Sequence, residues 1–312
     1  MKKIIYVSPY RRSQISGGIK VMYRHVEMLN EHGFSAKIFS PAGHPNWFAS
    51  TAPLVDGNAL PNNSDHVLVF TEDLNGQVAE IIQRKFYASK VLLCQNQYRS
   101  FSEALSSSTY SELGFEHFIT VGQIARGFLE RVHSPARFDV VPVWVDDALF
   151  APRAKELRIS VIPRKLRTEF RVIREIFSRK YADLARLVSW DVIDKISEDA
   201  TAEIMGKSAV FLSLSDMECC PLTPLEAMSS GCLVVGFHGY GGKEYASKDN
   251  GIWISPDALE ETADALAGAM MGFQSQDPEF VRMRDNGMAT AKRFNERRTV
   301  DELTRVFTAI AA

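Results

Sequence analysis

The chain has 312 residues, 46% of them apolar, and its 36 basic and 38 acidic side chains leave a formal net charge of -2. These values are typical of a soluble protein with about two domains, and they argue against a general electrostatic surface for nucleic acid. No apolar run approaches the roughly 18 residues of a membrane span. The apolar start at residues 4–7 is too short for a signal peptide.

Neither the cysteines nor the histidines indicate a metal site. The seven histidines are scattered without a His-Glu-x-x-His motif, and the four cysteines show neither metal-ligand spacing nor a disulfide framework. We therefore expect a protein without a bound metal or cofactor, in a reducing cytoplasmic compartment.

The first half of the chain alternates predicted strands and helices. Apolar residues recur at spacings of three and four from Ile19 to Leu29, and Gly33 stands where a helix stop belongs, which predicts the first helix. Several strands are continuous apolar runs, as is typical of parallel strands buried on both faces. The predicted strands are 4–7, 36–40, 67–70, 91–94, 118–121 and 140–143. We expect residues 1–150 to form an N-terminal Rossmann-like domain.

The alternation continues in the second half, after a predicted crossing at 146–157. The predicted strands are 157–162, 187–190, 209–213, 232–236 and 251–254, and helices are predicted over 256–271, 278–294 and 296–311. Residues 151–295 are therefore expected to form a second doubly wound domain, with the last helix, 296–312, returning to the first. Ligands of such folds lie at the carboxyl ends of the strands, here expected in a cleft between two facing domains.

The most informative segment is 216–236, where seven residues separate Glu218 from Glu226. The segment predicts a strand end, a loop, a short helix and another strand. A helix amino terminus attracts a pyrophosphate, and carboxylates accept hydrogen bonds from hydroxyl groups. The arrangement is suited to holding a nucleotide sugar.

A simpler interpretation accounts for part of this segment. Thr223 as N-cap, Pro224 at the first helical position and Glu226 reaching back would form a capping box, which explains Glu226 without a ligand. It leaves Glu218 unexplained. Pro221 and Pro224 keep the helix from extending back to Glu218. The interpretation of Glu218 without a ligand is therefore a solvated loop carboxylate.

At these residues the chain resembles the retaining glycosyltransferases of family 4, the glycosyl transferases group 1, which have the GT-B architecture. The residues that carry the resemblance are Glu218, Glu226, Ala227, Met228, Gly231 and the strand 233–236. The resemblance implies that Glu218 binds donor-sugar hydroxyls, that Glu226 binds the ribose, and that amides near Leu222 and Thr223 bind the phosphates.

Further segments follow in the family's order. Gly17 and Gly18 resemble the glycine loop through which the backbone approaches the donor, although a tight turn explains two glycines equally well. The segment 140–150 resembles the family's crossover. Gly241 and Gly242 resemble the glycine pair that follows the donor strand.

The segment from Arg153 to Lys180 is rich in positive charge, with ten basic residues and three acidic ones. Arg164 and Lys165 follow a predicted strand where the family carries an Arg and a Lys that neutralise the leaving diphosphate. The family Lys usually lies several residues later, so either Lys165 or Arg167 fills this role. Arg171, Arg174 and Arg179 are interpreted as a solvated basic helix face.

The sequence departs from the family pattern in two places, one at the donor site and one in the domain that recognises the acceptor. Cys219 and Pro221 replace glycines that are common in the family signature, and Pro221 has no amide donor. The first domain, where the acceptor is recognised, departs most. Its acceptor candidates are His44, Glu72 and Gln95, which lie in predicted loops after strands.

The resemblance implies a retaining, metal-independent transferase that uses a nucleotide diphosphate sugar as donor substrate. The expected acceptor is a saccharide or lipid-linked saccharide, in cell-surface polysaccharide or glycoconjugate synthesis, without nucleic acid. Peripheral contact with the inner face of a membrane stays open. The alternatives are a noncatalytic partner of another glycosyltransferase, and a nucleotide-sugar epimerase or phosphorylase. The base, the sugar, the linkage and the oligomeric state are not determined by the sequence.

Overall fold

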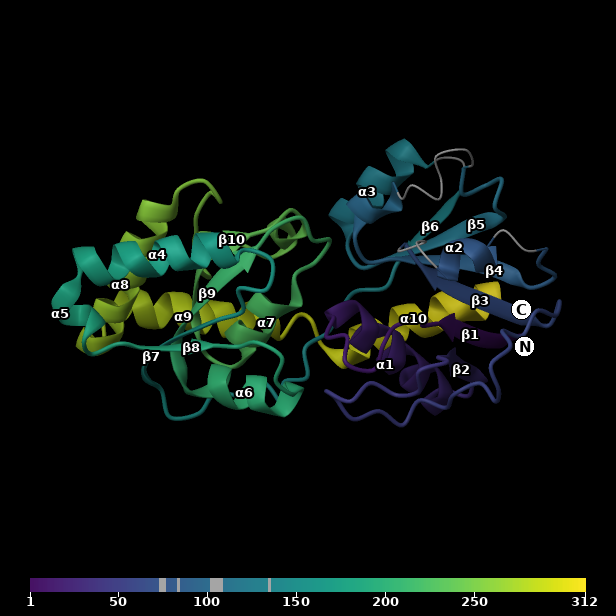
Figure 1. The fold of residues 1–312 in the computed structure, drawn as a ribbon, viewed down its shortest axis with the longest axis horizontal. Helices are drawn as coiled ribbons and strands as arrows, with labels where there is room; N and C mark the ends of the chain where they lie inside the picture. The colour runs from purple at the N-terminus through teal and green to yellow at the C-terminus, as the bar shows by residue number, and fades with distance from the viewer. Residues whose placement is uncertain (73–76, 83–84, 102–108, 134–135) are drawn as a thin grey trace. The chain divides into compact units, whose positions relative to one another are not determined.

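The computed structural model describes residues 1–312 except 73–76, 83–84, 102–108 and 134–135 (Figure 1). Internal contacts divide the chain into two compact units. Unit 1 comprises Met1–Val143 and Arg297–Ala312, and unit 2 comprises Trp144–Glu296. The change from unit 1 to unit 2 thus lies seven residues before the predicted boundary at residue 150.

Unit 1 is built on a six-stranded parallel sheet in the order β2-β1-β3-β4-β5-β6. Its strands are β1 (Lys3–Val7), β2 (Ala36–Phe39), β3 (His66–Thr71), β4 (Ser89–Cys94), β5 (Phe115–Thr120) and β6 (Arg137–Val140). Strand β3 is buried at every position, and β1 and β4 are buried at their last four positions, as the apolar runs predicted.

The last strand of this sheet corrects one prediction. The apolar run at 140–143 predicted a strand there, but β6 pairs with β5 over Arg137 to Val140. The strand lies at the sheet edge and its residues alternate between polar and apolar, so it does not form the continuous apolar run that marks a buried strand. Pro142 has no N–H to continue the ladder.

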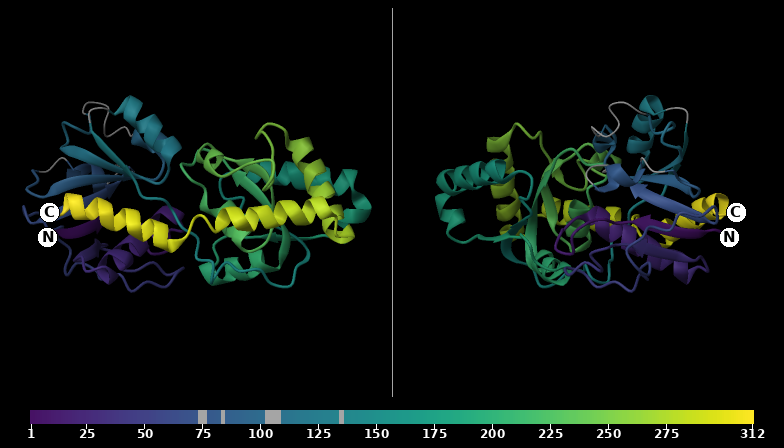
Figure 2. Two further views of the ribbon diagram at one scale, coloured as in Figure 1. Left: turned by 180° about the vertical axis from the view of Figure 1, so that it is seen from behind. Right: turned by 45° about the vertical axis from the view of Figure 1, so that its right-hand side comes forward.

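Helices α1 (Gly17–Glu31), α2 (Gln77–Ile82), α3 (Gln123–Val132) and α10 (Glu296–Ile310), with the short η1 (Gln97–Ser100), complete unit 1. Helix α10 lies alongside β1 (Figure 2), and the backbone amide of Lys2 donates to the carbonyl of Ala311 at 2.8 Å. Phe307 is fully buried, with its ring centroid 6.1 Å from that of Tyr6. The last helix is therefore part of the core of unit 1.

Unit 2 is built on a five-stranded parallel sheet in the order β11-β10-β9-β7-β8. Its strands are β7 (Glu156–Val161), β8 (Ser189–Val192), β9 (Ser208–Ser215), β10 (Leu233–His238) and β11 (Ile252–Trp253). Its helices are α4 (Arg167–Lys180), α5 (Ala182–Ala185), α6 (Glu198–Lys207), α7 (Leu222–Ser229), η3 (Gly241–Glu244), α8 (Leu259–Ser275) and α9 (Pro278–Ala291). Helices α4 and α8 lie side by side and cover one apolar core with the sheet.

Both sheets reverse their strand order beside the first strand of the unit. In unit 1 the reversal lies between β1 and β3, and in unit 2 it lies between β7 and β9. At such a switch point the connections leave toward opposite faces, which opens a crevice at the carboxyl ends of the two strands. The prediction of two Rossmann-like doubly wound sheets is confirmed. None of the described helices is long and apolar enough to cross a membrane.

Candidate functional site

The switch point of unit 2 brings Lys165 and Glu218 together. Lys165 lies in the connection from β7 to α4, and Glu218 lies in the loop that follows β9. The Lys165 ammonium donates to Glu218 Oε1, and the two side chains are 36% and 27% exposed. A cation and a carboxylate from segments 53 residues apart therefore meet, accessible to solvent, at the crevice.

Helix α7 starts immediately beside this pair. Its first residue is Leu222 and its N-cap is Pro221, without any capping hydrogen bond from a side chain. The predicted capping box is therefore wrong, since Thr223 is the second helical residue and Glu226 the fifth. The fixed φ of proline starts the helix earlier than a Thr cap would. The first amides of a helix lack intrahelical acceptors, so Leu222 and Thr223 lie where an anion is favoured.

Glu226 lies on α7 and is only 6% exposed. It is the fifth residue of the helix, whereas the capping-box interpretation required it at the third helical position. A carboxylate accepts hydrogen bonds only, so a nearly buried one is suited to a hydroxyl-bearing partner.

The connection after β10 holds the Glu218 loop from the other side. The amide of Gly241 donates to the Glu218 carbonyl at 2.8 Å, and the amide of Tyr240 donates to the Asp216 carbonyl at 3.2 Å. A Cβ at Gly241 would lie 1.4 Å from the Cys219 carbonyl oxygen. Gly239 has φ +65°, and a Cβ there would lie 2.5 Å from the Asp216 oxygen. The glycines allow two backbones to touch.

Tyr245 fastens the start of α7. Its hydroxyl donates to the Pro221 carbonyl at 2.9 Å, and burial raises its pKa well above the usual value, which keeps it a neutral donor. Asn250 Nδ2 in turn donates to the Tyr245 carbonyl at 2.6 Å. Sequence reasoning assigned no function to Tyr245 or Gly239. The only signal was the spacing of Gly239, Gly241 and Tyr245 after an apolar strand.

The other two basic candidates of unit 2, Arg164 and Arg167, have surroundings that differ from those of Lys165. Arg167 opens α4, and its guanidinium donates to Asp194 Oδ2 at 2.8 Å. Arg164 lies on the same connection as Lys165 and is exposed. Gly242 lies in η3, where a Cβ would lie 3.1 Å from that of His238. Of the two residues that sequence reasoning left open, the structure brings Lys165, not Arg167, to Glu218.

The predicted residues of unit 1 also gather near its switch point. Gly17 and Gly18 open α1, and Gln95, which follows β4, donates from Nε2 to the Gly18 carbonyl at 3.1 Å. The backbone N–H of Gln95 donates to Glu72 Oε2 at 3.0 Å, and Glu72 is buried directly after the end of β3. Gly18, Glu72 and Gln95 therefore form one hydrogen-bonded group.

His44 lies in the connection that follows β2. Its ring centroid is 5.8 Å from that of Tyr23, and its backbone carbonyl accepts a hydrogen bond of 2.8 Å from Arg12 Nε. The nearby Trp47 Nε1 donates to the Gln14 carbonyl at 3.1 Å. These bonds join the loops after β1 and β2, and they place His44 in that pair of loops.

No group of three or more His, Cys, Asp or Glu side chains that could hold a metal occurs within the described part of the chain. The charged side chains on the segments that flank the unit 2 crevice include Lys165, Arg164, Glu218 and Glu226, and the positive end of α7 lies beside them.

Comparison with known proteins defines the class. Residues 182–307 match the family Glycosyl transferases group 1, a range that includes the Glu218 loop, α7, the glycines after β10 and most of α10. The chain therefore carries a glycosyl transferases group 1 domain, and its two Rossmann-like sheets are those of the GT-B fold.

Particular relatives span nearly the whole chain. An alpha-1,6-glucosyltransferase of Actinobacillus pleuropneumoniae serotype 7 (strain AP76) is 23% identical over 305 residues, covering 94% of this chain and 91% of that protein. The sucrose-phosphate synthase structure from Thermosynechococcus elongatus has a TM-score of 0.70 at 14% identity, covering 99% of both chains. Anabaena Alr3699/HepE in complex with UDP-glucose has a TM-score of 0.67 at 13% identity, covering 99% of this chain and 100% of that one. The two structural likenesses establish the fold.

Proposed function

We propose that the chain transfers a sugar from a nucleotide diphosphate sugar to a saccharide or lipid-linked saccharide, with retention of the anomeric configuration and without a metal. The observation that carries the proposal is the Lys165–Glu218 pair at the switch point of unit 2, beside the start of α7. A positive group for the diphosphate and a carboxylate for the sugar stand next to each other there.

Donor binding would exchange the partners of this pair. The diphosphate takes the Lys165 ammonium, Arg164 and the amides of Leu222 and Thr223, while the sugar hydroxyls donate to the released Glu218. An ion pair this exposed contributes only about 0–1 kcal/mol, so opening it costs little. The nearly buried Glu226 accepts from the ribose hydroxyls. Gly17, Gly18, Gly241 and Gly242 are proposed as further backbone contacts of the donor.

The same groups serve the chemical step. The bond from the anomeric carbon to the diphosphate oxygen breaks, the acceptor oxygen bonds to that carbon on the same face, and the acceptor proton passes to the departing phosphate oxygen. Negative charge grows on the diphosphate, where Arg164, Lys165 and the α7 dipole stabilise it. These fixed positive charges take the part that a metal ion plays elsewhere.

Unit 1 is proposed to recognise the acceptor. Glu72 and Gln95 are hydrogen-bonded to each other and to Gly18 at the carboxyl ends of the strands, which suits hydroxyl recognition. His44 is a further acceptor candidate. The alpha-1,6-glucosyltransferase relative and the UDP-glucose complex support UDP-glucose as the first donor to test.

The test separates the functions of the two carboxylates. Glu218→Gln should lower turnover of the matching nucleotide sugar by about 10²–10³, because transition-state contacts of this kind contribute on that scale, while the Kd for UDP changes little. Glu226→Ala should raise the Kd for UDP by about tenfold or more, since a hydrogen bond to a charged group contributes about 1.5–3 kcal/mol. Glu175→Gln, at an exposed carboxylate on α4, is the matched control and should change neither.

Calorimetric titration with UDP and a coupled assay of UDP release give both quantities. Equal, small effects of the two substitutions would contradict the assigned functions. Nucleotide binding without turnover on any donor and acceptor pair would instead support the noncatalytic partner.

A further inference from the structure

Unit 1 contains a pocket that the proposed reaction does not use. It has a volume of about 280 Å³ and lies at the carboxyl ends of β5 and β6, between the start of α3 and helix α10. Val140 and Pro142 contribute its apolar lining. Neither Glu72 nor Gln95 is among the residues that line it, so the pocket is distinct from the group that these two residues form.

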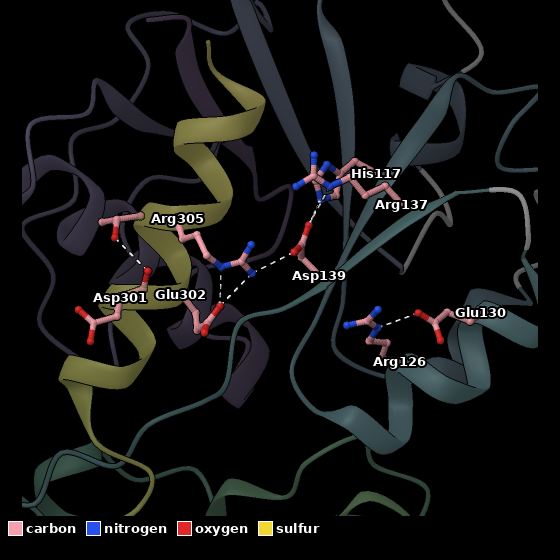
Figure 3. Close-up of polar contacts among 9 residues, drawn as sticks. His117, Arg126, Glu130, Arg137, Asp139, Asp301, Glu302 and Arg305 are labelled. Carbon is pink, nitrogen blue, oxygen red and sulfur yellow. Dashed lines mark hydrogen bonds and ion pairs between the residues drawn. The ribbon is translucent and has the colours of Figure 1, made fainter.

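Three guanidinium groups line this pocket. Arg126 comes from α3, and Arg298 and Arg305 come from α10, while Glu302 is the one carboxylate among the lining residues. Figure 3 shows Arg126 and Arg305 projecting from their helices toward the space below Asp139. Arg126 lies at least 172 positions before the other two arginines in the chain, and together they supply like charges to one small hollow, which favours an anion there.

Carboxylates hold two of these arginines without cancelling their charge. Arg126 Nε donates to Glu130 at 2.7 Å, which uses one of the five N–H groups of the guanidinium. Arg305 donates from Nε to Glu302 and from a terminal nitrogen to Asp139, both at 2.9 Å. The guanidinium planes are therefore oriented in advance, as a strong oxyanion site requires.

Asp139 is the anchor of this arrangement. It is buried and lies 2.9 Å from His117 Nε2 and 3.2 Å from Arg137 Nε, besides its bond from Arg305. Burial acts to raise the pKa of Asp139, but hydrogen bonds from Arg305 and His117 outweigh it and hold the pKa below its usual value. Burial lowers the pKa of His117, so His117 is neutral near pH 7. Among the residues that line the pocket itself, three are arginines and one, Glu302, is a carboxylate.

The start of α3 adds a second source of positive potential. Gln123, the first residue of this helix, lines the pocket, and its side-chain amide is a hydrogen-bond donor. The N-cap is Gly122, which supplies no capping side chain, and the first turn contains no acidic residue. The positive end of the α3 dipole therefore lies at the same hollow as the arginines.

We propose that this pocket of unit 1 binds a phosphate group through Arg126, Arg298, Arg305 and Gln123. Its volume is at the small end of ligand pockets, which span about 300–1,000 Å³, so it accommodates one compact anionic group rather than a nucleotide. The forked guanidinium groups match the oxygen geometry of phosphate. The phosphate is either a free ion or part of a phosphomonoester.

The experiment uses the full chain in an Arg164→Ala/Lys165→Ala background, which removes the proposed donor-phosphate contacts of unit 2. Inorganic phosphate and glucose 6-phosphate are titrated separately by calorimetry. We expect saturable binding that weakens by about tenfold or more in Arg126→Gln and in Arg298→Gln, because each removes charge-assisted hydrogen bonds. Arg131→Gln on α3 and Arg297→Gln on α10 lie outside the pocket and should bind as the background does.

Each outcome decides the proposal. Tighter binding of glucose 6-phosphate identifies a phosphomonoester as the ligand, and equal binding of both probes identifies free phosphate. Absence of saturable binding in the background overturns the proposal, as does equal weakening by the pocket and control substitutions. Because the donor contacts are already removed, neither result depends on whether the proposed transferase activity is found. Circular dichroism of each variant verifies that unit 1 is folded.

Discussion

The two switch points of this chain have the same topology and different chemistry. In unit 1 a hydrogen bond of 2.7 Å between Tyr10 and Thr71 joins the loop after β1 to the end of β3, and Gln95 ties Gly18 to Glu72. In unit 2 an ion pair of two partly exposed side chains, Lys165 and Glu218, occupies the equivalent place. Topology supplies a crevice in both units. The side chains decide whether the crevice holds a set of hydrogen bonds, as in unit 1, or an ion pair whose cation can meet an anionic ligand, as in unit 2.

Among the variants predicted here, substitution of Gly241 should disrupt the unit 2 crevice most strongly. In Gly241→Ala the new Cβ would lie 1.4 Å from the Cys219 oxygen, so the Glu218 loop must move. We expect the free energy of unfolding to fall by roughly 3 kcal/mol and UDP binding to be lost. Urea unfolding and calorimetry measure the two effects.

Gly268 on α8 provides the control for this prediction. A Cβ there meets nothing within 4 Å, so Gly268→Ala should stabilise by about 0.5–1 kcal/mol through helix propensity. Similar changes in both variants would show that the contact with Cys219 does not determine the loop.

Acid should destabilise unit 1 through His25. This side chain is fully buried against β1, 3.2 Å from the Tyr6 hydroxyl, and burial lowers its pKa to about 3. Between pH 6.5 and 3 the unfolded chain binds a proton that the folded chain does not bind. Stability is therefore complete above about pH 6.5 and falls by about 1.4 kcal/mol per pH unit as the pH decreases.

The variant His25→Gln keeps an acceptor for Tyr6 but does not titrate. Its free energy of unfolding, measured by urea titration from pH 7.5 to 4.5, should fall less steeply than that of the unsubstituted chain, by about 2–3 kcal/mol over the range. Part of the slope should remain, because burial also lowers the pKa of His117 and His133 in unit 1. Parallel profiles would contradict the assignment to His25.

The hydroxyl of Tyr245 tests how far the position of α7 determines nucleotide binding, because it bonds to the start of α7 and is not among the proposed donor contacts. Tyr245→Phe removes the buried hydrogen bond to the Pro221 carbonyl. We expect a loss of about 1–2 kcal/mol in unfolding free energy, together with a weaker affinity for UDP. Unchanged UDP affinity at reduced stability would show that Tyr245 acts on the fold alone.

The smallest effect is expected in unit 1. Gln95→Ala removes one partly buried hydrogen bond to Gly18 and should cost about 1 kcal/mol of stability. The KM for the acceptor should rise while the Kd for UDP stays the same. A change in UDP affinity as large as that of Glu226→Ala would contradict the proposed division of labour between the units.

Local patterns predicted much of the fold. The apolar spacing from Ile19 to Leu29 corresponds to α1, and the continuous apolar runs correspond to buried strands such as β3 and β9. The edge strand β6 was misplaced, because its alternating polar residues resemble a loop more than a buried strand. The Thr223 capping box failed because Pro221 starts the helix two residues earlier.

For the candidate site, too, the sequence predicted some features and the structure added others. The functions proposed for Glu218, Glu226 and the other site residues stay predictions until the variants are measured. What the structure adds is a set of partners that sequence reasoning did not find, among them Gly239 and Tyr245 around the Glu218 loop.

Features that depend on residues close together in the chain could be read from the sequence alone. These are the alternation of strands and helices, and the loop carboxylate followed by a short helix. Only the tertiary structure decided that Lys165 rather than Arg167 meets Glu218, and that the Gly241 backbone touches Cys219. The physical reason is strand order. β7 and β9 are neighbours in the sheet although β8 lies between them in the chain, and such long-range pairing leaves no periodic signal in the sequence.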